Sequence, residues 1–397
     1  MGNISKQRES APSTASGGAC DELLSRCLSG EQWAPDLLDS AVAENSGRAF
    51  FSVVVERLGD LFEPRLCSVY DRLMSDVIAR AAPELGSRLR PFGPRHSGRP
   101  PASPPGTANR VYVLSRVTLG ADVAVTSVLL DAAKRRYPHA EILFAGPRKS
   151  YELFEDDARV RHFPFEYARG GSLADRLRAS ASLWIEDGIV IDPDSRLSQL
   201  GLISVSPEDR YFFFPSRSYG GESLDRLPDL AARWAHEVFG VEGARPYIAP
   251  RETHVLTADI TVSLGVGDNE SKRAGGDFER ELLRALASTG ASLLVDKGGS
   301  PQEAALVEQA LPRGARTHQG AFAVFASLIR RSKLFVGYDS AGGHVASASG
   351  IPVISIAKGF ASDRMAARWK PNGVVLDGDD PLLLQKVKAA MSLTPGP

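Results

Sequence analysis

Short apolar runs alternate with helical segments from Arg110 to Met391, and this alternation most limits what the chain can fold into. An apolar run at residues 111–115 predicts a buried strand. Residues 122–137 follow with apolar side chains at helical spacing, and residues 141–145 return to a strand pattern. Strands that alternate with helices predict a parallel sheet that helices cover on both faces.

The alternation restarts after residues 246–251, which contain two prolines and form a break. We therefore expect the α/β fold class, with two Rossmann-like, doubly wound domains at residues 110–248 and 249–397 that face each other across a cleft. Ligands of such sheets bind beyond the carboxyl ends of the strands. The expected strands are 111–115, 141–145, 188–191, 211–214, 260–264, 292–295, 334–336 and 352–356. The expected helices are 122–137, 223–239, 277–288, 301–310, 321–332, a short helix near His344, and 381–391.

The part before Arg110 has a different texture. Residues 1–19 are polar and predict a disordered tail, and residues 20–89 predict a helical extension. Its apolar stripe is formed by Leu66, Val69, Tyr70, Leu73, Met74 and Val77. Residues 90–109 form a linker rich in proline and arginine, which we expect to be extended. Arg95 and Arg99 would then be solvated, or would touch anionic lipid headgroups.

Composition excludes several classes of protein. The formal net charge is −1, which argues against a nucleic-acid binder. No apolar run approaches about 20 residues, so we expect no membrane span. The three cysteines have no spacing typical of a disulfide framework or a zinc site. Residues 1–18 lack the apolar core of a secretory signal, and we expect a cytoplasmic protein.

Residues 334–357 are the most informative segment, with a strand, a turn of small residues, a helix and a second strand. Gly342 and Gly343 permit close approach at the helix start, where free N–H groups and the helix dipole favour a diphosphate. Asp339 and Ser340 lie where they can reach sugar hydroxyls. We expect His344 to be neutral and to bond a phosphate or ribose. The alternative is a tight turn with Asp339 or Ser340 as the helix cap.

Two other strand ends of the second domain carry polar groups. Gly265, Lys272 and Arg273 follow its first strand, and cations there can neutralise the charge on a departing diphosphate. Gly299 and Glu303 follow the next strand, and Glu303 can accept hydrogen bonds from ribose hydroxyls. The alternatives are solvated loop cations and an acid that favours a helix N-terminus. Three such elements at successive strand ends would converge on one cleft.

Residues 110–391 resemble glycosyltransferase family nine, the lipopolysaccharide heptosyltransferases, which have the GT-B fold. The resemblance depends on an opening strand–Gly–Asp–helix segment and on a motif Asp-[Ser/Thr]-Gly-x-x-His-x-x-x-x-x-Gly-x-Pro. The residues that match the second motif are Asp339, Ser340, His344, Gly350 and Pro352.

The resemblance also implies roles. Asp122 matches the catalytic base, although a helix-start acid is the local alternative. Lys272 resembles the lysine that meets the donor phosphates, and Glu303 the acid that meets the nucleoside. The acceptor side is expected to include Arg116, Asp192 and Arg196. Three departures accompany the match: Ala121 is inserted before Asp122, Ala341 replaces a glycine, and Ala274-Gly275 replaces Trp-Pro.

Asp192 and Asp194 form an Asp-x-Asp pair, which holds a metal in other glycosyltransferases. The pair lies far in sequence from the phosphate elements. We therefore expect no metal, and favour Asp194 or Ser195 as a helix cap.

These features predict a metal-independent, inverting glycosyltransferase without a cofactor. A nucleoside-diphosphate sugar, with heptose as one option, would be the donor, and a glycan or lipid-linked acceptor of lipopolysaccharide or another envelope glycan would receive it. Asp122 would take the acceptor proton and Lys272 would stabilise the leaving diphosphate. Peripheral contact with the cytoplasmic face of the inner membrane is an option, and a nucleic-acid partner is not expected. The alternatives are a catalytically decayed nucleotide-sugar binder or scaffold, an epimerase or hydrolase of the same fold, and an interaction protein that uses its N-terminal helices.

Overall fold

The computed structural model describes residues 18–90, 95–96, 100, 102–168, 171–252, 257–267 and 270–393. The expected polar tail lies outside these residues, apart from Gly18 and Ala19. The chain divides into two compact units, Met1–Gly59 and Asp60–Pro397. In the described ranges, no helix combines the length and the apolar character needed to span a lipid bilayer.

The first unit is helical in its described part. Leu23, Leu38 and Phe50 are among its fully buried side chains. Its elements are α1 (Ala19–Ser29), α2 (Pro35–Ala43), a 3-10 turn (Glu44–Gly47), a π-helical stretch (Phe50–Val55) and most of α3 (Glu56–Asp60).

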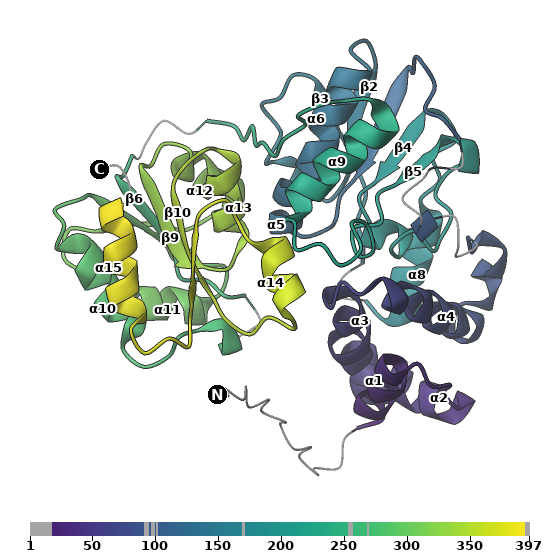
Figure 1. Ribbon diagram of the computed structural model, residues 1–397, viewed down its shortest axis with the longest axis horizontal. Helices are drawn as coiled ribbons and strands as arrows, with labels where there is room; N and C mark the ends of the chain where they lie inside the picture. Colours follow the sequence, from purple (N-terminus) through teal and green to yellow (C-terminus); the bar gives the residue numbers. More distant parts are fainter. Residues whose placement is uncertain are drawn as a thin grey trace, which may run out of the picture. The chain divides into compact units, whose positions relative to one another are not determined.

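The second unit begins with α4 (Pro64–Ala81), followed by the 3-10 stretch Pro83–Arg88. The predicted apolar stripe is buried on α4. After these helices, the second unit contains two parallel sheets, which confirms the predicted fold class (Figure 1).

The first sheet has the strand order β3-β2-β1-β4-β5, with every pairing parallel. Alternation along β1 directs Val111 and Val113 into the core that also holds α6 (Ser127–Arg136) and α9 (Leu227–Phe239). Tyr112 and Leu114 enter the core on the other face. Helices α6 and α9 lie side by side (Figure 1). The strands are β1 (Arg110–Leu114), β2 (Glu141–Gly146), β3 (Val160–Pro164), β4 (Ile189–Asp192) and β5 (Tyr211–Phe213).

The first helix of this domain contains a π-helical turn, Asp122–Thr126, between α5 (Leu119–Ala121) and α6. A π turn holds one residue more than an α turn. The extra residue therefore lies directly after Ala121, where the sequence departs from the family motif. The shorter helices of the domain are α7 (Arg148–Tyr151) and α8 (Leu173–Ser182).

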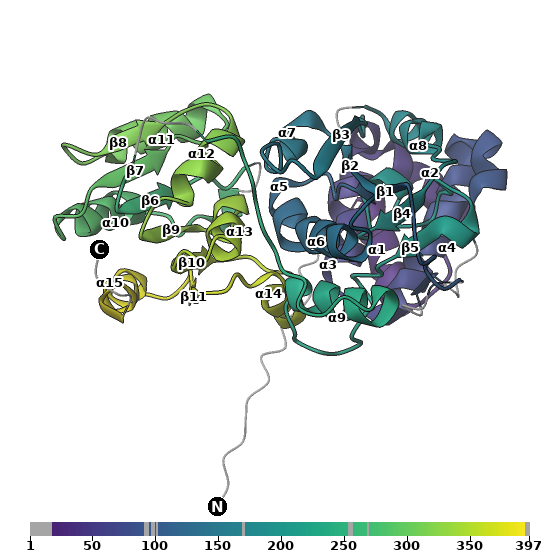
Figure 2. The same cartoon turned by 90° about the horizontal axis from the view of Figure 1, so that it is seen from above.

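The second sheet has the order β11-β10-β9-β6-β7-β8, again all parallel. Figure 2 shows α10 and α15 on one side of the strands and α12 and α13 on the other. Its strands are β6 (Ile260–Ser263), β7 (Leu293–Asp296), β8 (Arg316–His318), β9 (Leu334–Tyr338), β10 (Val353–Ala357) and β11 (Val374–Asp377). Its helices are α10 (Phe278–Ala287), α11 (Pro301–Ala310), α12 (Phe322–Ile329), α13 (Ala341–Ala348), α14 (Asp363–Trp369) and α15 (Leu383–Leu393).

The elements not predicted from the sequence are β3, β8, β11, α7, α8 and α14. The three missed strands are all at sheet edges. Only one residue of β3 and one of β8 is buried, and none of β11 is. Edge strands cover less apolar surface than central ones, so they lack the apolar run that reveals a buried strand.

The segment after residue 88 packs more tightly than the linker prediction allowed. Leu89, just before the predicted linker, forms an antiparallel bridge with Ile203, and Arg90, the first linker residue, donates its N–H to the carbonyl of Leu202 at 2.8 Å. Arg95 is 6% exposed and forms a buried ion pair with Asp71 on α4. The expectation of a solvated Arg95 is therefore wrong, because a carboxylate on a preceding helix neutralises it. Arg99 lies outside the described residues.

Candidate active site

Each sheet has one point at which its strand order reverses. In the first sheet this point lies between β1 and β4, and in the second between β6 and β9. The loops that follow such a strand pair diverge to opposite faces and leave a crevice for a ligand. Most of the residues singled out in the sequence follow these four strands.

Lys272 and Asp339 meet across the second crevice. Lys272 ends the turn Glu270–Lys272 that follows β6, and Asp339 directly follows β9. The Lys272 Nζ donates to Asp339 Oδ2 at 3.2 Å. The two side chains remain 28% and 14% exposed, so a ligand can reach them. The structure therefore brings together two residues that were expected on the donor side.

Helix α13 starts immediately after this pair. Ser340 occupies the N-cap position but makes no side-chain cap bond. Its hydroxyl is buried and has no hydrogen-bond partner within the described residues. Ser340 is therefore not the helix cap that the alternative interpretation proposed. Burial lowers the pKa of His344, more than the nearby Asp339 carboxylate raises it, so the imidazole is neutral near pH 7.

The two glycines of α13 have different surroundings. A Cβ on Gly342 would approach the ring of Phe335 to 2.6 Å, so this glycine allows α13 to pack on β9. A Cβ on Gly343 would meet only ordinary van der Waals contacts. Packing of the helix on the sheet thus accounts for Gly342 without a ligand.

Glu303 holds two loops of the donor side together. Its Oε1 accepts from the N–H groups of Val266 and Gly267 at 3.0 and 3.2 Å, and its Oε2 accepts from Gly299 N at 2.9 Å. The side chain is 6% exposed. A Cβ on Gly265 would lie 3.2 Å from Oε1, which is a tight contact. The carboxylate therefore joins the loops after β6 and β7 and does not stand free for a ribose.

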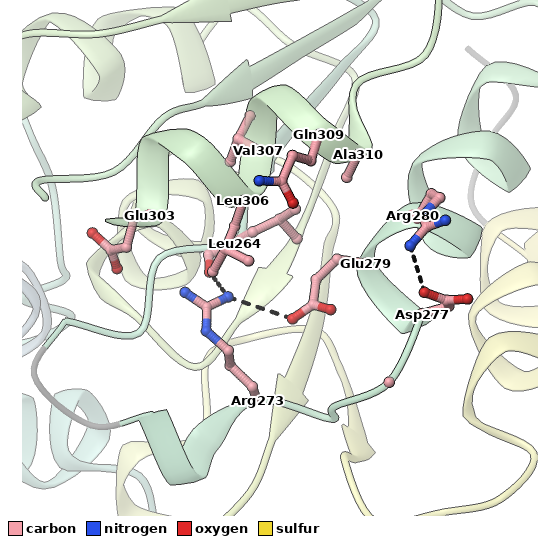
Figure 3. A pocket seen from close by; sticks show the side chains of 11 residues that line it. Leu264, Arg273, Asp277, Glu279, Arg280, Glu303, Leu306, Val307, Gln309 and Ala310 are labelled. Carbon is pink, nitrogen blue, oxygen red and sulfur yellow. Dashed lines mark hydrogen bonds and ion pairs between the residues drawn. The ribbon is translucent and has the colours of Figure 1, made fainter. Parts of the chain in front are cut away.

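Arg273 lies apart from Lys272, although the two are adjacent in sequence. Figure 3 shows its guanidinium beside the carbonyl of Leu264 and the carboxylate of Glu279, at 3.1 and 3.4 Å. These residues line a cavity of about 80 Å³ between α10 and α11. Arg273 thus contributes to packing beneath these helices, and the expected pair of phosphate-binding cations is reduced to Lys272.

Asp122 lies at the first crevice and is fully buried. Its Oδ1 accepts from Arg116 N at 2.7 Å and from Thr126 Oγ1 at 2.8 Å, and its Oδ2 accepts from Ser115 Oγ at 2.8 Å. Burial raises the pKa of this carboxyl, while the hydroxyls of Ser115 and Thr126 oppose that change. No cation is paired with Asp122 in the described part of the chain.

The turn that Asp122 supports has a strained backbone. Val117 has φ of +67°, a conformation that β-branched residues rarely adopt. Its N–H donates to Ser115 Oγ at 2.8 Å, and that hydroxyl in turn donates to Asp122. The network holds the turn that presents Arg116.

Arg116 bridges two loops of the acceptor side. Its Nη1 donates to Ser216 Oγ at 2.8 Å and to the carbonyl of Pro193, so it joins the loops after β1, β4 and β5. Arg196 begins a 3-10 turn in the same region and is partly buried.

Asp192 and Asp194 are occupied by protein partners. Asp192 accepts from Ser195 N at 2.7 Å and from Tyr211 Oη at 2.6 Å, and burial raises its pKa to about 6. Burial also raises the pKa of Asp194, but the ion pair with Arg217 outweighs this effect and leaves that pKa below its usual range. No cluster of three or more metal-ligating side chains occurs within the described ranges. Asp192 thus orders the loop after β4 through bonds to its own domain.

The two crevices meet where α5 approaches α13. A Cβ on Gly120 would lie 3.1 Å from His344 Cδ2, so glycine permits this approach. Trp369, at the end of α14, has its ring 5.8 Å from the ring of His344 and 5.8 Å from the Arg116 guanidinium carbon. The preceding Arg368 is fully buried. Trp369 and Arg368 were not predicted as site residues, because the sequence shows them only as an aromatic and a basic residue in a segment without a motif.

A cleft of about 680 Å³ opens beside Asp339 at the carboxyl ends of β9, β10 and β11. This volume is within the usual range for small-molecule sites. Its wall mixes apolar residues with polar and charged ones, which include Ser355, Lys358, Ser362, Asp363, Lys370 and Asp377.

No protein-family model matches this sequence. No curated protein matches it either. Among solved structures, E. coli heptosyltransferase WaaC with ADP is 16% identical, with a TM-score of 0.52 over 72% of this chain and 100% of that chain. A family 9 glycosyltransferase from Veillonella parvula DSM 2008 is 14% identical, with a TM-score of 0.54 over 74% of this chain and 92% of that chain.

The chain has the heptosyltransferase fold. WaaC with ADP-2-deoxy-2-fluoro heptose gives the same result, at 14% identity and a TM-score of 0.50 over 70% of this chain and 98% of that chain. The predicted GT-B architecture is confirmed. Each of these structures is covered almost completely while a substantial part of this chain is not, so this GT-B protein has a large addition to the shared fold.

Proposed function

We propose that this protein transfers a sugar from a nucleoside-diphosphate sugar to a hydroxyl acceptor. The observation that carries the proposal is the Lys272–Asp339 pair, which spans the β6–β9 crevice beneath the start of α13. A partly exposed lysine next to free helix N–H groups suits a diphosphate. Bound diphosphate would compete with Asp339 for the ammonium group, and the released carboxylate would become available to sugar hydroxyls.

Asp122 is the proposed general base of an inverting displacement. Among the three buried carboxylates of the first crevice, Asp194 is neutralised by Arg217, and Asp192 lies beneath the β4 loop. Asp122 has a pKa raised by burial and lies two residues from Gly120, which packs on His344. A carboxylate of raised pKa is a better proton acceptor. An acceptor hydroxyl would replace one of its present donors, and the Ser115 hydroxyl, which can rotate, is the easiest to displace.

The leaving diphosphate would be stabilised by Lys272 and by α13, without a metal or a cofactor. The bound molecules named for the WaaC structures, ADP and an ADP-heptose analogue, make adenine nucleotides the first donors to test. We propose a glycan or lipid-linked glycan as the acceptor. We also propose that the protein is cytoplasmic and reaches this acceptor at the inner membrane. Burial of Arg95 removes one of the cations that could have attracted anionic lipid.

Nucleotide binding is the first test. Isothermal titration with ADP, UDP and GDP should give a dissociation constant for at least one of them. Lys272→Ala should raise this dissociation constant by about 10-fold to 100-fold, because it removes a charge-assisted hydrogen bond to the nucleotide. Lys333→Ala is a matched control, because Lys333 pairs with Asp259 at 3.0 Å at the opposite ends of the same two strands. Equal affinity of the wild type and Lys272→Ala for every nucleotide would refute the donor site.

Turnover is the second test. The donors to use are sugar derivatives of the nucleoside diphosphate that binds. They should be consumed only when an acceptor is present, and NMR should show inversion at the anomeric carbon. Asp122→Asn should keep nucleotide affinity and lower turnover by about 10²–10⁴-fold. Unchanged turnover would exclude Asp122 as the base.

A second candidate function is nucleotide-sugar binding without transfer. The observation that favours it is the complete burial of Asp122, with both carboxylate oxygens engaged by protein donors. A non-catalytic protein would bind the nucleotide sugar with the same dependence on Lys272 and release no free nucleoside diphosphate with any acceptor. Donor loss without an acceptor would instead indicate a hydrolase or epimerase.

A further inference from the structure

Trp369 is in contact with both crevices. Its ring lies 5.8 Å from the ring of His344 at an interplanar angle of 67°, and 5.8 Å from the guanidinium carbon of Arg116. His344 belongs to the donor side and Arg116 to the acceptor side. The indole is only partly buried, unlike the adjacent Arg368. A partly open aromatic ring therefore lies where donor and acceptor must meet.

The backbone that carries Trp369 is held firmly. Arg368 is 0% exposed and donates to the carbonyls of Ser216, Tyr219 and Gly221 at 2.9, 3.1 and 2.9 Å. Burial lowers the pKa of this guanidinium to about 10, which leaves it charged at neutral pH. A side chain fixed by three carbonyl bonds one position away keeps the indole in a defined place, as recognition of a rigid ring requires.

Two further contacts, both to Phe62, hold helix α14 in place. Arg364 Nη1 donates to the carbonyl of Phe62 at 3.1 Å. The Phe62 ring meets the Trp369 ring edge to face, with centroids 6.4 Å apart. Helix α14 is thus bound to the acceptor domain through Arg368 and to Phe62, which precedes α4, while its Ala366 and Ala367 line the cleft beside Asp339.

The chemistry of a bound sugar fits this place. If the diphosphate lies at the start of α13, the attached sugar extends from His344 toward Arg116, past the indole. A pyranose ring presents hydroxyls at its rim and C–H bonds on its faces. The cleft wall supplies polar partners such as Asp339 and Lys370 for the rim. Trp369 is not among the residues that line this cleft; it lies beside His344 and Arg116, where it supplies the apolar surface that the faces need.

We propose that Trp369 is the platform on which the transferred sugar stacks, and that it sets which sugar is accepted. This inference depends on the proposed function, because it needs a diphosphate at α13. It goes further by giving the sugar a contact that the nucleotide lacks. A role in packing alone would instead make Trp369 equally important for both ligands.

Titration with matched ligands separates these cases. ADP, UDP and GDP are compared with ADP-heptose, UDP-glucose and GDP-mannose, and the pair that binds the wild type is then used for every variant. Trp369→Ala should lower the affinity for the nucleotide sugar by about fivefold to tenfold and leave the affinity for the nucleoside diphosphate unchanged. Trp369→Phe, which keeps an aromatic face, should recover most of the loss.

The control is Trp184→Ala, since Trp184 is 47% exposed and stacks with Arg88 instead. Thermal unfolding of each variant reports on packing. Equal weakening of both ligands, or a loss that Trp369→Phe does not recover, would overturn the platform. If no nucleoside diphosphate binds the wild type, the proposed function fails and the platform fails with it. Binding of the diphosphate with normal sugar affinity in Trp369→Ala overturns the platform alone.

Discussion

Replacement of Glu303 by glutamine tests whether this residue holds loops or binds ribose. The carboxylate accepts three backbone N–H groups, two at Oε1 and one at Oε2. A glutamine of the same shape has one acceptor oxygen and one NH₂ group. If its oxygen faces Val266 and Gly267, its NH₂ group faces the N–H of Gly299, and that donor is left unpaired.

The size of the effect follows from this geometry. Leaving one buried backbone donor without a partner costs about 1–3 kcal/mol. In a domain of this size each kcal/mol lowers Tm by about 2–4 °C, so Glu303→Gln should lower it by roughly 2–12 °C. Glu303→Ala removes all three acceptors and should lower it further. The measurement is urea unfolding and differential scanning calorimetry at one pH.

The control is Glu308→Gln on the same helix. Glu308 is 59% exposed and pairs with Lys297 at 2.7 Å, and an exposed pair of this kind contributes about 0–1 kcal/mol. If Glu303→Gln lowers Tm no more than Glu308→Gln does, the reasoning is wrong. Loss of nucleotide affinity with an unchanged Tm would restore Glu303 to a ribose contact.

Three further outcomes are expected. Arg368→Met should lower the free energy of unfolding by at least about 3 kcal/mol in urea, because three buried carbonyls lose their donor; a smaller change than Arg280→Met, at an exposed arginine, would contradict this role. Gly120→Val should abolish turnover while it lowers Tm only slightly, since the added side chain would meet His344. Full activity of this variant would disprove the close approach of α5 to α13. The pKa of His344 is below its unfolded value, so the unfolded chain binds more protons between the two values and stability should fall as pH decreases from about 7 to 5. His344→Gln should flatten that slope in pH-dependent urea unfolding, and an identical slope would show that His344 does not cause it.

Much of the fold could be predicted because it depends on local patterns. The central strands are apolar runs and the helices carry apolar stripes, so both appear in short windows of sequence. Edge strands such as β11 and the helix α14 escaped, because their burial depends on neighbours that are distant in the chain. The linker prediction was wrong for Arg95, because proline and arginine content does not reveal that Asp71 on an earlier helix forms an ion pair with it.

For the candidate site, sequence located the loops better than the side chains. Lys272, Asp339 and His344 lie together at the predicted crevice. Arg273 follows Lys272 directly and yet packs beneath α10, since a one-residue step in a loop turns the side chain to another side. The inserted Ala121 was visible in the sequence, but not that a π turn would absorb it and leave Asp122 buried.

The sequence alone determined two parallel α/β domains and the strand ends at which polar loops gather, because hydrophobic periodicity and glycine-rich turns are local properties. The tertiary structure decided which polar groups remain free. The carboxylate of Glu303 accepts from N–H groups up to 37 positions away, and Arg368 donates to carbonyls 147 to 152 positions away. Trp369 acquires its place between His344 and Arg116 only when both sheets are assembled. A buried polar group must find partners wherever the fold provides them, and no local pattern records where that is.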